Sequence, residues 1–141
     1  MALRDLREAV RAELATDLAI EFDSGPPLFE GGITRRSRGY VWAEGIVRAD
    51  AGLWEEAEIH ARLYLKLVEP RSDEDSVDPQ PLEDAAEALR DAIANRKRLT
   101  AAGGVWLLRF VSVEIDYVSQ FAELIIRAGI ESPYELAETT G

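Results

Sequence analysis

Residues 58–68, EIHARLYLKLV, decide the fold of this chain. The residues of this stretch alternate in character along the chain. One side carries Ile59, Ala61, Leu63, Leu65 and Leu67, and the other carries His60, Arg62, Tyr64 and Lys66. Only an extended strand with one buried face turns this alternation into a continuous apolar stripe, because successive side chains of a strand point to opposite faces. We therefore predict a central strand whose second face, His60 included, is solvated.

Two amphipathic helices are predicted to cover the apolar face of this strand. Residues 2–17 and 82–96 both place apolar side chains at spacings of three and four, which puts them on one side of a helix. The predicted buried positions are Leu3, Leu6, Val10, Leu14 and Leu18 in the first helix and Leu82, Ala85, Ala86, Leu89 and Ile93 in the second. Charged residues occupy the opposite sides, so both helices are expected to lie at the surface of the domain.

Residues 40–48 are predicted to form a second strand, joined to the central one by a turn at residues 49–52 as an antiparallel hairpin. Val41, Ala43, Gly45 and Val47 would share one face, and Tyr40, Trp42 and Ile46 the other. Because both faces are partly apolar, the second face is expected to meet a loop or another protein. Gly45 is a candidate β-bulge. A short strand is also expected at residues 19–22.

The second half of the chain contains a long strand at residues 105–117, which follows a break at residues 100–104. The first half of this strand is apolar on both sides, which indicates burial on two faces. Residues 121–130 fit two interpretations. They alternate as a strand does, but Ser119 could also cap a helix there. We favour a strand that pairs with residues 105–117.

The composition indicates one domain. The chain has 141 residues, of which 47% are hydrophobic and 30% are charged, which is typical of a globular protein. We predict a single α+β domain over residues 1–131, with a mainly antiparallel sheet of about four to five strands packed against two helices. Residues 132–141 would form a flexible acidic tail. The start of the chain lacks the apolar run of a signal peptide, and no stretch is apolar for the roughly 20 residues of a membrane span, so we expect an intracellular, soluble protein.

Two irregular stretches have some features of binding sites. Residues 28–38 contain Gly31, Gly32 and three arginines, but no helix start accompanies them, so a solvated loop is favoured over an anion site. Residues 69–81 contain three prolines and five acidic residues. A calcium loop starting at Asp73 would need glycine at its sixth position, where Asp78 stands, so an acidic mobile loop is favoured.

The chain lacks recognisable catalytic equipment. It has no cysteine, which excludes disulfides and thiolate chemistry, and His60 is its single histidine. Glu114 and Asp116 share one face of the predicted long strand, but nothing nearby in the pattern completes a site. We therefore expect no catalytic, metal or cofactor site. The net charge of −11 argues against a protein that grips nucleic acid through its phosphates.

The order of elements resembles that of the tail terminator (tail-completion) proteins of long-tailed bacteriophages. The segments that carry the resemblance are ALRDLREAVRAEL, EIHARLYLKLV, PLEDAAEALRDAIANR, VWLLRFVSVEIDY and FAELIIRAGI. The resemblance implies a sheet flanked by helices, and a ring of six copies assembled in the host cytoplasm. In the virion, such a ring caps the tail-tube protein at the head-proximal end, stops tail growth and offers a surface to a head-completion or neck protein. DNA would pass the lumen without specific binding, and no cofactor, enzyme activity or membrane would be involved.

Two other functions remain open at this stage. The chain could be a different head–tail joining or minor tail component of a phage, or a non-viral cytosolic interaction module. In each case the function depends on protein contacts. Tyr40, Trp42 and Trp106 are the candidate contact residues, because they are large side chains without an obvious partner in the predicted core.

Overall fold

The computed structural model describes residues 3–27, 37–48, 55–66, 78–94, 98–101 and 104–130. These residues form two helices and a six-stranded sheet. In chain order the elements are α1 (Leu3–Leu18), β1 (Phe22–Ser24), β2 (Arg38–Arg48), β3 (Glu55–Tyr64), α2 (Gln80–Ala94), β4 (Arg98–Ala101), β5 (Gly104–Asp116) and β6 (Phe121–Ile130). The predicted α+β class is confirmed, with a slightly larger sheet than expected. Residues 28–36 of the loop predicted at 28–38, most of the acidic loop and the tail at 132–141 lie outside the described residues.

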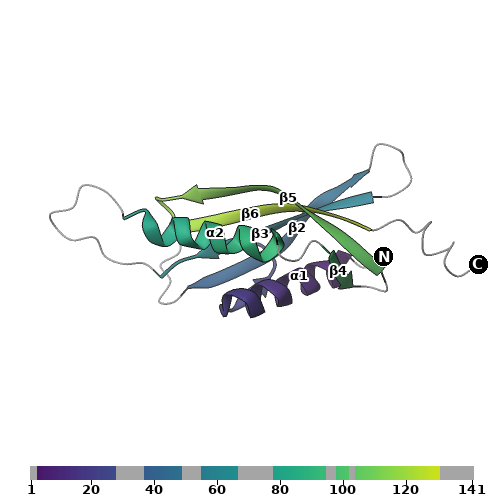
Figure 1. The fold of residues 1–141 in the computed structure, drawn as a ribbon, viewed down its shortest axis with the longest axis horizontal. Helices are drawn as coiled ribbons and strands as arrows, with labels where there is room; N and C mark the ends of the chain where they lie inside the picture. Colours follow the sequence, from purple (N-terminus) through teal and green to yellow (C-terminus); the bar gives the residue numbers. More distant parts are fainter. Residues whose placement is uncertain are drawn as a thin grey trace, which may run out of the picture.

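The strands lie side by side in the order β1-β2-β3-β6-β5-β4 (Figure 1). Every neighbouring pair is antiparallel except β1 and β2, which are parallel. The ambiguous C-terminal segment is therefore a strand, and it pairs with β5 as favoured from the sequence. It also pairs with β3, so β6 lies in the middle of the sheet.

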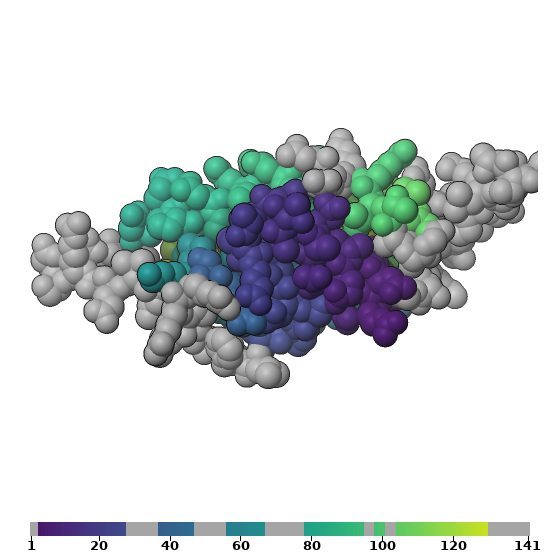
Figure 2. All heavy atoms as spheres, turned by 90° about the horizontal axis from the view of Figure 1, so that it is seen from below, coloured from purple at the N-terminus to yellow at the C-terminus, as the bar shows by residue number. Residues whose placement is uncertain are grey.

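Both helices cover one face of the sheet, called the inner face below. α2 packs mainly on β5 and β6, whereas α1 contacts β1, β2, β3 and β4. Because α1 touches strands at both edges, the sheet curls around it. Figure 2 views the molecule from below and shows α1, in purple, on this side. The core between the layers contains the predicted stripes of both helices, with Leu6, Leu14, Ile59, Leu63 and Leu89 at most 1% exposed.

A bulge in β2 changes which residues share a face. The register shifts between Ala43 and Gly45, as predicted for Gly45. One residue is inserted there, so the alternation reverses beyond it. Ile46 consequently pairs with Ala57, a buried inner-face residue, and lies on the inner face. The unbroken alternation predicts it on the opposite face, with Tyr40 and Trp42.

β5 contains a second bulge, between Phe110 and Ser112. Before it, the inner face carries Trp106 and Leu108; after it, Val113 pairs with the buried Leu124. The apparently two-sided apolar pattern of this strand thus has a simple cause. The inner-face residues are apolar throughout, the bulge reverses the alternation after Phe110, and the apolar outer-face residues before it are themselves partly buried.

Two short strands differ from the sequence-based prediction. β1 begins at Phe22, because α1 continues to Leu18 and is followed by Ala19, which has a φ of 55°. A residue in this left-handed region commonly terminates a helix. β4 was missed altogether: its four residues pair with the start of β5 as a hairpin, where the sequence predicted only a break.

Gly39 allows β1 to approach β2, and its replacement is expected to destabilise the protein. A Cβ at Gly39 would lie 2.2 Å from two ring atoms of Phe22, a buried residue that is 2% exposed. Since the ring is held in the core, Gly39→Ala should lower the free energy of unfolding by roughly 1–3 kcal/mol. Urea denaturation measures this loss. Gly45→Ala is the matched control, because a Cβ there meets nothing within 4 Å; equal losses in the two variants would contradict the packing described.

Candidate functional site

The outer face of the sheet, opposite the helices, carries a compact group of aromatic and charged side chains. The outer-face cluster consists of Tyr40 and Trp42 on β2, His60, Arg62 and Tyr64 on β3, and Phe121 and Glu123 on β6. The strand register brings them together in cross-strand pairs. Cross-strand neighbours on one face are close enough to stack and to form ion pairs.

Arg62 lies at the centre of the cluster. Its guanidinium carbon is 4.1 Å from the centre of the Phe121 ring, 5.4 Å from that of Trp42 and 5.9 Å from that of Tyr64. Its Nε donates to Glu123 Oε1 at 2.7 Å, and its Nη1 donates to the Tyr64 hydroxyl at 3.0 Å. Burial lowers the pKa of Arg62, but the hydrogen bonds to Tyr64 and Glu123 outweigh it, so the net shift is upward. The guanidinium therefore stays charged.

Glu123 connects this guanidinium to the only histidine of the chain. Its Oε2 lies 3.3 Å from His60 Nδ1, and His60 Nε2 lies 3.2 Å from Glu58 Oε2. The side chains of His60 and Glu123 are 12% and 11% exposed. The prediction that His60 occupies a solvated position is therefore wrong, because Glu123 of the neighbouring β6 lies on one side of the imidazole and Glu58 of β3 itself on the other.

Aromatic contacts fix the remaining members of the cluster. Tyr64 packs edge-on against Tyr40 and Phe121, with ring centres 5.9 and 5.3 Å apart. Trp42 lies 5.5 Å from the His60 ring and donates from Nε1 to Glu44 at 2.7 Å. Tyr64 is 1% exposed although its strand position faces away from the helices. The cluster is thus a preorganised patch whose side chains already hold one another in place.

The three predicted contact residues occupy different environments. Trp106 is 1% exposed and belongs to the core, so the premise that it lacks a core partner is wrong. Tyr40 is 9% exposed, and Trp42 is partly exposed beside it. The register brings Tyr40 and Trp42 onto one patch and leaves Trp106 on the inner face. A role of Tyr40 and Trp42 in protein contacts stays a prediction.

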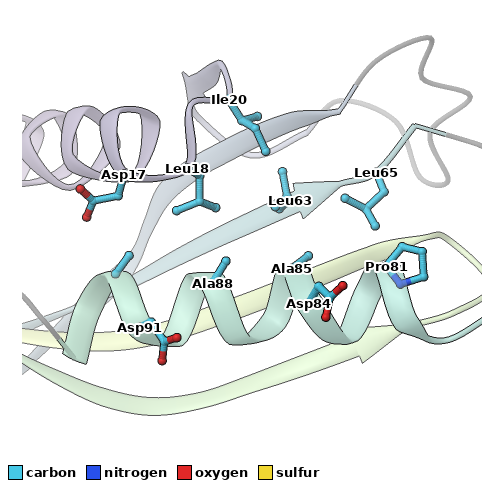
Figure 3. Close-up of a pocket in the computed structure, with 11 residues that line it drawn as sticks. Asp17, Leu18, Ile20, Leu63, Leu65, Pro81, Asp84, Ala85, Ala88 and Asp91 are labelled. Atoms are coloured by element: carbon cyan, nitrogen blue, oxygen red, sulfur yellow. The ribbon is translucent and has the colours of Figure 1, made fainter.

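An open groove of about 860 Å³ lies on the other side of the molecule, between the end of α1 and α2 (Figure 3). Its apolar lining includes Leu18, Ile20, Leu63 and Leu65, which face the alanines of α2. Asp17, Asp84 and Asp91 are the charged residues of the lining. No sequence pattern predicts this groove, because it depends on where the end of α1 lies relative to α2 and the end of β3.

Among the described residues, no group of three or more histidine, aspartate or glutamate side chains could hold a metal ion. Neither helix of the described part is long and apolar enough to cross a membrane. The expected lack of a cofactor and of enzyme activity stays a prediction.

No family model and no curated protein matches this chain. Among solved structures, it is similar to a chain in the virion of a native gene transfer agent (GTA) particle. The two chains are 16% identical, with a TM-score of 0.47, and the match covers 92% of this chain and 96% of the other. At this level of similarity the match does not identify a function for this chain.

Proposed function

We propose that this protein is a structural virion protein, a tail terminator that forms a ring on the end of a phage tail tube. The ring stops tube growth and presents its opposite side to a neck or head-completion protein. The observation that carries the proposal is the outer-face cluster, which no helix of the described chain covers. The order of elements, with its resemblance to tail terminators, supports the specific role.

The composition of the cluster suits a protein contact. Tryptophan, tyrosine and arginine are the side chains that most often dominate interface energies. Arg62, Tyr64 and Glu123 are already ordered by mutual contacts, so binding would cost little side-chain entropy. Trp42, at the accessible side of the cluster, would be the residue that a partner covers.

A ring also fits the remaining requirements of a terminator. The end of a tail tube exposes unpaired binding surface, and growth stops once a protein occupies that end without offering the same surface again. Contacts between two different patches of neighbouring copies close such a ring. The net charge of −11 would keep DNA from adhering to the lumen as it passes.

Trp42→Glu tests this proposal. The substitution places a charge at the accessible side of the cluster, so the monomer should stay folded and lose ring formation and tail capping. Cells infected with a phage that carries this variant should contain overlong tail tubes without heads, as measured by electron microscopy. Val118→Glu, at a residue that is 95% exposed, is the matched control and should leave tails normal.

The phenotype separates the proposal from its alternatives. Tails of normal length that join heads would contradict the terminator function. Tails of normal length that fail to bind heads would point instead to another head–tail joining component.

A further inference from the structure

Both lateral edges of the sheet are only partly covered by their outermost strands. β1 pairs with residues 39–41 of β2. Along the edge of β2 that faces away from β3, no strand of the described chain pairs with residues 42–48. β4 pairs with residues 104–107 of β5. On this opposite edge of the sheet, no strand of the described chain pairs with residues 108–116 along the side that faces away from β6. Such stretches present rows of backbone donors and acceptors that can pair with a strand of another chain.

Large apolar side chains are exposed on both bare stretches. Ile46 on β2 is 51% exposed, and Phe110 and Val111 on β5 are each 47% exposed. In the described part of the chain, the other exposed large apolar residues are Tyr117 and Val118, which lie in the turn after β5. Exposed apolar area therefore gathers where no strand of the described chain pairs with the backbone, and a single partner strand would cover both.

We infer that residues 42–48 of one copy pair with residues 108–116 of a second copy, which continues the sheet from copy to copy. This inference rests on the proposed ring and identifies the contact that closes it. The occupant is a second copy because the two bare edges lie on opposite sides of the same sheet. Each copy can then pair its β2 edge with one neighbour and its β5 edge with the other, as closed rings require.

The directions of the strands support this pairing. β2 is antiparallel to β3, β3 to β6, and β6 to β5, so β2 and β5 run in opposite directions. Copies related by rotation about an axis along the strands would therefore meet as an antiparallel pair. An antiparallel pair needs no crossover connection, and its ladder is slightly the more stable of the two types.

The side chains match as well. Ile46 pairs with Ala57, and Phe110 pairs with Ile126, and both of these partners are buried inner-face residues. When the sheet continues across copies, Ile46 and Phe110 lie on the same inner face and can cover each other. The bulge beside each of them restricts the register, which disfavours indiscriminate edge pairing.

Two charge variants, used singly and mixed, test this contact. Ile46→Glu and Phe110→Lys each bury a charge against an apolar residue in every contact of a ring, so neither variant alone should form rings. In an equal mixture, the introduced glutamate of one variant meets the introduced lysine of the other, and the unaltered edges meet each other. Alternating rings should then form. Sedimentation velocity and electron microscopy, with and without tail tubes, measure ring formation.

Each outcome decides between interpretations. Both residues are about half exposed, so both variants should melt like the wild type, and Val118→Lys, the matched control, should form rings normally. Rings formed by either variant alone overturn the edge pairing and leave the tail-terminator proposal intact. Loss of rings in both variants without rescue in the mixture also overturns it, because it shows that the two edges contribute to the ring without pairing with each other. A wild-type chain that forms no ring even on tail tubes overturns the proposed function together with this contact.

Discussion

Truncation of Trp106 to alanine is expected to lower the free energy of unfolding by about 3–5 kcal/mol. Trp106 is 1% exposed and stands between Leu99 of β4 and the end of β6. Its removal leaves a cavity at the point where the edge hairpin joins the central strands, and the small β4 cannot collapse into it without losing its own pairing. Urea denaturation followed by circular dichroism gives the loss directly.

Trp42→Ala is the matched control for this prediction. Trp42 is partly exposed on the outer face, so its truncation should cost no more than about 1 kcal/mol. The contrast separates a core tryptophan from a surface one. Equal losses at the two positions would show that the inner and outer faces of the sheet have been assigned wrongly.

Arg62→Ala is expected to cost about 2–4 kcal/mol, because it leaves the carboxylate of Glu123 with one charged partner fewer in a largely buried place. Glu123 is 9% exposed and receives its shortest hydrogen bond from Arg62. The range is set below that for a fully buried pair because the Arg62 side chain is 22% exposed. The same substitution removes the guanidinium that covers the Phe121 ring.

The double variant Arg62→Ala with Glu123→Gln should be more stable than Arg62→Ala alone, because the uncompensated charge is gone. Thermal melts of both single variants and the double variant complete the cycle. Arg90→Ala is the control: Arg90 pairs with Asp91 on the surface of α2, and both side chains are more than half exposed, so the loss should be about 0–1 kcal/mol. An effect at Arg62 no larger than that at Arg90 would contradict a structural role for the cluster.

The elements with a strong period were predictable from the sequence, and the reason is physical. The helices and β3 each place their apolar side chains on a single face, so these residues recur at a regular spacing along the chain. The bulges were predictable only in part: Gly45 marks the one in β2, but no residue marks the one in β5. One inserted residue reverses the alternation, and without the partner strand the residue after Gly45 cannot be assigned to a face. Ile46 was placed on the wrong side for that reason.

The candidate site was less predictable, because its members become neighbours only through strand order. His60 and Tyr64 sit among charged residues in the sequence, and both looked solvated. They are largely buried because β6 inserts beside β3 and supplies Glu123 and Phe121. Trp106 was misjudged for a related reason, since its partner strand β4 has only four residues and no detectable period.

The central position of β6 has a consequence for how the chain is made. β3 leaves the ribosome well before its neighbour in the sheet, since Tyr64 pairs with Phe121. Long-range pairing of this kind requires the closure of a large loop and is slow. Until residues 121–130 are synthesised, β3 lacks the strand that pairs with its edge opposite β2. Folding to the sheet described here must therefore follow translation of nearly the whole described chain, and an abortive product that stops before Phe121 would expose the strand that should be the best protected.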